Sequence, residues 1–184
     1  MKRIVGILFI LFYCVQNLPA QKKYICKEVR ISFYSKAPLE DIQSHNTKAL
    51  SAFDASTGQI EFSVLIKGFE FEKAKMQEHF NEDYIESDKF PKAVFVGTIK
   101  NPGDLKLDKD GVYKVQVSGS LTLHGITKPE NTEAAFTVKG REVSAVADFA
   151  VAVSDFNIKI PSLVADKVSK TVRIVINVPS YQSH

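Results

Sequence analysis

Hydrophobic and polar residues alternate along most of the chain, in segments bounded by Gly, Pro, Asn or Asp. Successive side chains of a β-strand point to opposite faces of the sheet, so an alternation with period two indicates a strand with one buried face. In the segment 59–67, for example, every second residue from Ile60 to Ile66 is apolar. Eight segments of this kind predict strands at residues 24–36, 46–54, 59–67, 92–100, 112–123, 131–138, 141–153 and 169–178.

Eight such strands predict an all-β fold, and we expect an antiparallel eight-stranded β-barrel. A closed sheet has no exposed edges, and the interior of an eight-stranded barrel is either filled by side chains or holds one small ligand. The predicted inner face mixes phenylalanine with alanine and glycine, a pattern that suits a hollow barrel and a solid core equally. A two-sheet sandwich with a filled core therefore stays open as an alternative.

The strand alternation is interrupted at residues 72–86. Met76, Phe80 and Tyr84 follow one another at intervals of four, which is the spacing of one face of an amphipathic helix. Pro91 restricts the residue before it to an extended conformation and so marks the return to strands. We expect this short helix to pack at a mouth or a side of the barrel, with Met76 and Phe80 as candidate lid residues, although such spacing is more often part of a core.

The N-terminus has the form of a secretory signal. Lys2 and Arg3 precede an apolar run at residues 4–15, and Ala20 ends a small-residue cleavage site. We predict a signal peptide at residues 1–20, a single domain at 21–184 and a periplasmic or secreted protein. The run of about 12 residues is shorter than the roughly 20 that span a bilayer, so we expect no transmembrane anchor after cleavage.

Two alternatives at the N-terminus stay open, namely retention of the apolar run as an anchor and lipid attachment at Cys14. Removal of the signal leaves 22 basic residues against 21 acidic ones and a net charge of about +1. Together with the absence of a Lys/Arg-rich run interleaved with aromatics, this balance argues against a nucleic-acid partner. Cys26 would be the sole cysteine of the processed chain, so no internal disulfide is expected.

The chain has no glycine-rich phosphate loop, no Gly-x-Ser-x-Gly elbow, no CxxC pair and no HExxH motif. We therefore predict a protein that is not an enzyme, with no catalytic residues, no metal and no cofactor. The competing hypothesis is a metal-dependent enzyme in which His79 and His124 act with Glu78 or Asp83. In the simpler interpretation, His79 lies on the solvent-exposed face of the helix, and His124 makes a hydrogen bond within the turn before Gly125.

Three sequence motifs occur in a characteristic order. They are MQEHFNEDYIESDKFPKAVFVG at residues 76–97, GSLTLHGITK at 119–128 and DFNIKIP at 155–161. In these motifs and their spacing the chain resembles the YceI-like family of lipocalin-like, polyisoprenoid-binding proteins, over roughly residues 24–178. It departs from better-known members in the helix region, where it reads MQEHF instead of an Asp-x-His-Leu sequence.

The resemblance implies an exported lipid-binding protein that encloses a polyisoprenoid chain or an isoprenoid quinone, for transport, storage or sequestration. A structural or interaction domain with a filled core is the alternative. A homodimer, which would extend a tunnel or cover its mouth, is neither required nor excluded by the sequence. From the alternation, the residues predicted to line the hydrophobic tunnel are Phe33, Phe53, Phe62, Val64, Phe95, Val117, Leu121, Phe136, Phe149 and Ile174.

Overall fold

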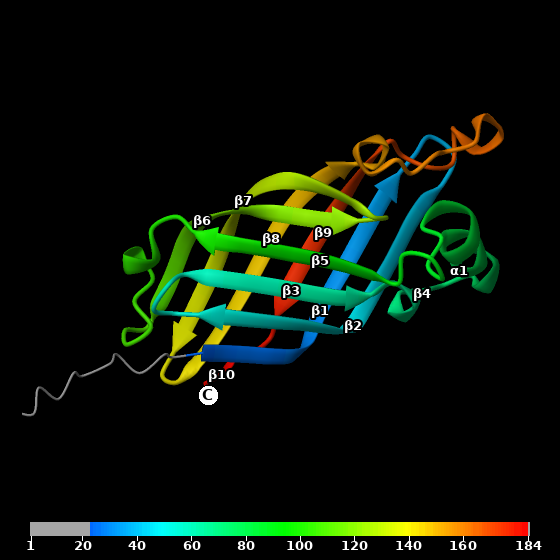
Figure 1. Ribbon diagram of the computed structural model, residues 1–184. Helices are drawn as coiled ribbons and strands as arrows, with labels where there is room; N and C mark the ends of the chain where they lie inside the picture. Colours follow the sequence, from blue (N-terminus) through cyan, green and yellow to red (C-terminus); the bar gives the residue numbers. More distant parts are fainter. Residues whose placement is uncertain (1–22, 184) are drawn as a thin grey trace, which may run out of the picture.

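A closed antiparallel β-barrel makes up most of the computed structural model, which describes residues 23–183 (Figure 1). Each strand pairs with the next along the chain, and β1 pairs with both β2 and β9, which closes the ring. The strands of the ring are β1 (Lys23–Lys36), β2 (Asp41–Asp54), β3 (Gln59–Leu65), β5 (Lys92–Ile99), β6 (Gly111–Leu123), β7 (Ile126–Lys139), β8 (Glu142–Ala152) and β9 (Thr171–Val178). The predicted eight-stranded, lipocalin-like barrel is confirmed.

Two short strands and several single turns of 3-10 helix lie beside the eight strands of the ring. The two-residue strands β4 (Glu70–Phe71) and β10 (Gln182–Ser183) pair with β2 and β1, respectively. Single turns of 3-10 helix are η1 (Ile66–Gly68), η3 (Pro102–Asp104), η4 (Val153–Phe156) and η5 (Ser162–Val164). Among residues 23–183, no helix is long and apolar enough to cross a membrane.

The second strand is longer than the predicted segment 46–54. It begins at Asp41, because β1 and β2 form one long hairpin in which Lys36 lies opposite Asp41 and Lys23 opposite Asp54. Residues 41–45 lie outside the predicted segment, which was therefore too short at its start. Backbone pairing with β1 makes them a strand in spite of their weak alternation.

The predicted helix at 72–86 is shorter than expected and lies at one end of the barrel (Figure 1). Only α1 (Ala74–His79) is α-helical, and it is followed by the π-helical turn η2 (Phe80–Tyr84). The Asn81 side chain donates a hydrogen bond to the backbone oxygen of Gln77 (2.8 Å), which competes with the regular helical hydrogen bonds. The Ile85 N–H then donates to Phe80 O, five residues back (3.0 Å).

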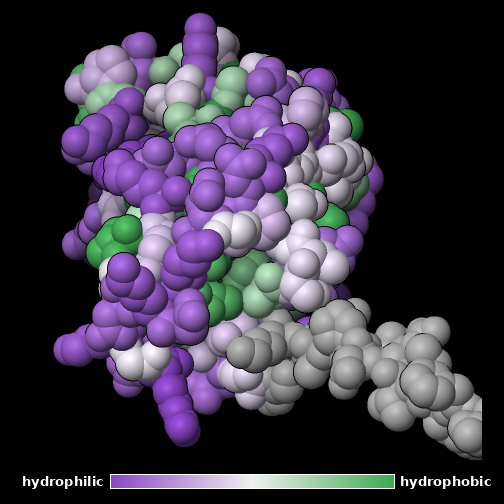
Figure 2. Space-filling view, turned by 90° about the vertical axis from the view of Figure 1, so that its left-hand side faces the viewer, coloured by the Kyte–Doolittle hydropathy of each residue, from purple (hydrophilic) through white to green (hydrophobic). Residues whose placement is uncertain are grey.

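The opposite end of the barrel is closed by aromatic side chains. Tyr181, after the last long strand, stacks on Phe136 with ring centroids 6.3 Å apart and also contacts Phe53 and Tyr24. Its hydroxyl lies 2.8 Å from the Ser51 hydroxyl, and burial raises the pKa of Tyr181. Figure 2 looks onto this end and shows a mostly hydrophilic face with small hydrophobic areas between the polar residues. The chain after β9 therefore seals one end of the barrel.

Candidate functional site

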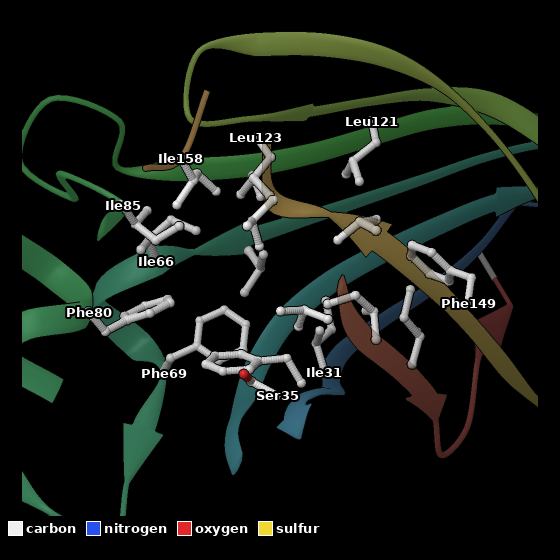
Figure 3. Close-up of a pocket in the computed structure, with 18 of the residues that line it drawn as sticks. Ile31, Ser35, Ile66, Phe69, Phe80, Ile85, Leu121, Leu123, Phe149 and Ile158 are labelled. Carbon is white, nitrogen blue, oxygen red and sulfur yellow. The ribbon is translucent and has the colours of Figure 1, made fainter. Parts of the chain in front are cut away.

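A cavity of about 520 Å³ occupies the part of the barrel between the aromatic closure and α1. Its wall consists almost entirely of aliphatic and aromatic side chains that point inward from the strands, including Ile31, Leu121 and Phe149 (Figure 3). Ser35 is the single polar residue labelled in this view. A compartment of this kind is suited to an apolar ligand with few polar groups.

The burial of inward-facing side chains shows that the barrel is not filled along its whole length. At the closed end, Phe136 has no exposed surface and Val143 has 2 %. Leu121, Phe149 and Ile174 also point inward, yet they are only half-buried. Because these side chains face the interior, their exposed surface lies on the cavity.

Most of the residues that the alternation assigned to a tunnel line this cavity. They are Phe33, Phe62, Val64, Phe95, Val117, Leu121, Phe136, Phe149 and Ile174. Met76 and Phe80 also line it, at the end near α1. That these side chains contact a ligand stays a prediction.

Phe53 does not line the cavity. It is 2 % exposed and packs in the aromatic closure, with ring centroids 5.9 Å from Tyr24 and 5.5 Å from Phe136. The alternation placed Phe53 correctly on the inner face, but a period of two carries no information about depth along the barrel axis.

Four phenylalanines gather at the mouth, namely Phe33, Phe69, Phe71 and Phe80. The Phe80 ring lies 4.9 Å from that of Phe71 and 5.9 Å from that of Phe69, measured between centroids. Phe33 lies 5.6 Å from both Phe69 and Phe71. Sequence reasoning did not assign Phe69 and Phe71 to the site, although their apolar alternation with Glu70 is visible in the sequence. This mouth cluster joins β1 to the segment that carries α1.

Polar groups surround the mouth cluster. Lys73 Nζ lies 3.0 Å from Glu40 Oε1, and Lys75 and Lys167 also line the opening. The Ser35 hydroxyl accepts a hydrogen bond from the Ser169 N–H (2.9 Å). The mouth therefore offers hydrogen-bonding and cationic groups to one end of a ligand.

Two loops at this end of the barrel expose leucines. Leu39 is 70 % exposed and Leu163 is 93 % exposed. Their loops are connected, because the Leu39 N–H donates a hydrogen bond to Asp166 O (3.0 Å). Glu40 and Val164, which follow the two leucines directly, line the cavity opening.

A pair of glycines makes room for an aromatic ring in the cavity wall. Gly97 of β5 lies opposite Gly119 of β6. A Cβ atom on either residue would lie 2.6 Å from the Phe95 ring, far inside van der Waals contact. The two glycines thus leave the space that the ring of Phe95 occupies against β5 and β6.

His124 lies in the turn between β6 and β7, where it is buried, and its hydrogen bonds reach two other segments of the chain. It is 8 % exposed, its Nδ1–H donates to Phe156 O (2.9 Å), and its Nε2 lies 2.9 Å from Glu86 Oε2. Within residues 23–183, the non-glycine residues with positive φ are Glu86, His124 and Asn157, which follows Phe156. Strained backbone therefore concentrates at the point where His124 joins three segments.

His79 has a different environment. It is exposed, as predicted, at the rim of the cavity, and its Nδ1 lies 2.6 Å from Asp83 Oδ2 one turn further on. His79 and His124 thus have separate carboxylate partners. In the part of the chain that the structure describes, no group of three or more His, Cys, Asp or Glu residues is placed to hold a metal ion.

Sequence comparisons connect the chain with one family. A family model described as YceI-like domain matches residues 27–179. A UPF0312 protein of Pseudomonas fluorescens is 33 % identical over 95 residues, which cover 50 % of this chain and 47 % of the relative. A UPF0312 protein of Pseudomonas putida is 38 % identical over 61 residues, or 33 % of this chain and 28 % of the relative. The matches thus span about half or less of these curated relatives.

Solved structures share the fold at low sequence identity. A polyisoprenoid binding domain from Saccharophagus degradans, implicated in plant cell wall breakdown, superposes with a TM-score of 0.77 at 12 % identity, over 89 % of this chain and 99 % of that one. Burkholderia cenocepacia BcnA gives 0.68 at 17 % identity, over 84 % and 96 %. The Campylobacter jejuni YCEI protein gives 0.54 at 18 % identity, over 74 % and 80 %. At these identities the similarity shows the fold.

Proposed function

Because this chain belongs to the YceI-like domain family, we propose that its barrel encloses a polyisoprenoid chain or an isoprenoid quinone. The observation that carries the proposal is the apolar cavity of about 520 Å³, closed at one end by Tyr181 and Phe136 and open beside α1. A long hydrocarbon chain gains about 0.8 kcal/mol for each CH₂ group that leaves water. A cavity of this shape favours a linear apolar ligand over a compact polar one.

The ligand would lie along the inward-facing residues that line the cavity, with Leu121 and Phe149 on its wall. Met76 and Phe80 would act as a lid, since both line the cavity where α1 and η2 cover its opening. The lysines at the mouth suit a polar or anionic end group, and the apolar interior suits the chain behind it. This arrangement supports a binding protein and not an enzyme.

We further propose that the protein acts outside the cytoplasm, periplasmic or secreted, in the transport, storage or sequestration of its ligand. The proposal is motivated by the predicted signal at residues 1–20. This segment, which includes Cys14, lies outside the described residues. We propose that residues 21–184 form a single domain. Leu39 and Leu163 support a transport role, because exposed apolar side chains beside the opening are suited to contact with the apolar phase that supplies the ligand.

Native mass spectrometry of the purified protein, followed by organic extraction, tests the proposal. The expected result is a co-purified isoprenoid, or uptake of one added isoprenoid quinone per chain. A protein that is free of ligand and takes up no quinone would contradict lipid binding and favour a structural or interaction domain. Dimer formation is read from the same spectra.

The metal-dependent enzyme remains the alternative of another class. This alternative rests on the presence of His79 and His124. In the structure the two histidines contact different carboxylates, Asp83 and Glu86, so their geometry does not favour a shared metal site. Elemental analysis of the purified protein provides the test. A stoichiometric metal, with loss of stability on chelation, would favour this alternative.

A further inference from the structure

The barrel wall has a seam between β7 and β8. The two strands pair only from Ala134, opposite Ala147, to Lys139, opposite Glu142. The first half of β7, residues 126–133, pairs with β6 alone, and residues 148–152 of β8 pair with β9 alone. In Figure 1 the first half of β7 follows β6 and diverges from β8. The ring of hydrogen bonds is therefore incomplete along this part of the cavity wall.

Polar side chains occupy the inner face of β7 along the seam. Glu130 and Thr132 have the same inward orientation as Ala134 and Phe136, and all four line the cavity. Across the seam, Phe149 of β8 lines the cavity as well. Away from the polar groups of the mouth, a carboxylate and a hydroxyl thus stand on an otherwise apolar wall.

Glu130 has no ion-pair partner among residues 23–183, although it is half-buried. Burial raises the pKa of its carboxyl group, and a hydrogen bond from the Asn131 backbone N–H offsets part of this rise. Glu133, three residues further along β7, points outward and lies 2.9 Å from Lys114 Nζ. The outward carboxylate of this strand is paired, and the inward one is not.

A half-buried carboxylate without an ion-pair partner costs stability, because it loses part of its hydration and the one backbone hydrogen bond from Asn131 does not replace all of it. An ionised carboxylate only accepts hydrogen bonds, so a ligand that donates them would remove that cost. A phosphate would be repelled from Glu130, whereas Lys75 and Lys167 at the mouth would attract it. The two polar regions of the cavity therefore favour ligand groups of opposite charge.

Building on the proposed function, we propose that Glu130 and the seam between β7 and β8 form a polar subsite for a hydrogen-bond-donating group of the enclosed amphiphile. A protonated amine fits this subsite best, and an alcohol or a phenol fits it better than an ether or a ketone. The ligand chain would run from the seam along the apolar wall toward the mouth.

Isothermal titration calorimetry at pH 7 with two ligands of equal chain length provides the test. Farnesylamine carries a donor, and farnesyl methyl ether carries only an acceptor. We expect the delipidated wild-type protein to bind the amine about tenfold more tightly than the ether, as for one hydrogen bond to a charged group. Glu130→Gln should lower this ratio without weakening ether binding, because a neutral amide oxygen accepts a weaker hydrogen bond than a carboxylate does. The matched control Glu133→Gln, on the outer face of the same strand, should keep the ratio.

Three outcomes would contradict the subsite in different ways. A wild-type ratio near one shows that no donor is recognised, and an unchanged ratio in Glu130→Gln shows that another group recognises it. In both cases, binding of the ether leaves the proposed function standing. Failure of both ligands to bind the wild-type protein would overturn the proposed function and the subsite together.

Discussion

The ring of Phe33 stacks on the ring of Phe80, with centroids 5.4 Å apart and an angle of 23° between the planes. Phe33 belongs to β1, whereas Phe80 begins the π-helical turn that follows α1. A helix of six residues has little stability of its own in water. The segment is therefore held over the cavity mouth by aromatic contacts with the barrel.

Replacement of Phe80 by Ala should open the mouth. The change removes the side chain that contacts Phe33, Phe69 and Phe71, so a bound ligand should leave about tenfold faster, because changes of affinity appear mainly in the dissociation rate. Stopped-flow fluorescence with a bound polyene fatty acid measures this rate. Tyr113→Ala, near the closed end, is the control, and equal release rates for the two variants would show that Phe80 is not a lid.

Filling the cavity should weaken ligand binding without unfolding the barrel. Ala147 points inward and lines the cavity, so Ala147→Phe should lower the affinity for an isoprenoid quinone at least about tenfold, while the added apolar contacts keep the fold stable. Ala150→Phe, on the outer face of the same strand, should bind as the wild type does. The chain has no tryptophan, so its intrinsic tryptophan fluorescence cannot report binding. Native mass spectrometry therefore follows the titration with quinone. Undiminished binding by Ala147→Phe would place the ligand elsewhere.

The glycine at position 119 should be intolerant of a side chain. A Cβ atom there would lie 2.6 Å from Gly97 Cα and 2.6 Å from the Phe95 ring, so Gly119→Ala should cost about 1–3 kcal/mol through overpacking. Urea unfolding measures the free energy. The matched control is Gly103→Ala, because a Cβ atom at Gly103 would meet nothing within 4 Å. Equal unfolding free energies for the two variants would refute the close approach of Phe95.

Acid should weaken the junction at His124. The hydrogen bond from His124 holds the pKa of Glu86 below its ordinary value of 4.5. A carboxyl group whose pKa is lower in the folded state stabilises the fold fully above its ordinary pKa, and this contribution is lost as the pH falls through the lowered value. Glu86→Gln should therefore be less stable than the wild type at pH 6, and the difference should shrink below pH 4.5.

Urea midpoints at pH 6 and at pH 3 measure this difference. Glu82→Gln serves as the control, because Glu82 is exposed on η2 close to the same junction in sequence. A difference between Glu86→Gln and the wild type that stays constant with pH would mean that the carboxylate does not stabilise the fold through its charge.

Much of the barrel could be predicted from local patterns. The period-two alternation placed Phe62, Val117 and Leu121 on the inner face, because the side-chain direction in a strand depends only on the neighbouring residues. The start of β2 was missed, since its pairing with β1 is a contact between distant residues. The extent of α1 was missed because a side-chain hydrogen bond from Asn81 to Gln77 O competes with the helical pattern.

The candidate site was only partly accessible to sequence reasoning. The alternation could not distinguish Phe53, in the aromatic closure, from Phe149, on the cavity wall, because depth along the barrel depends on strand stagger. It also could not identify His124 as buried, since both of its hydrogen-bond partners, Glu86 and Phe156, come from other segments of the chain.

By itself, the amino-acid sequence determined the number of strands in the ring, their inner faces and the position of the short helix. Only the tertiary structure decided that the barrel is hollow beside α1 and solid near Tyr181, and that β7 leaves β8 at Ala134. The physical reason is that alternation is a property of neighbouring residues. Closure, cavity volume and the environment of Glu130 arise from contacts between strands, which no local pattern specifies.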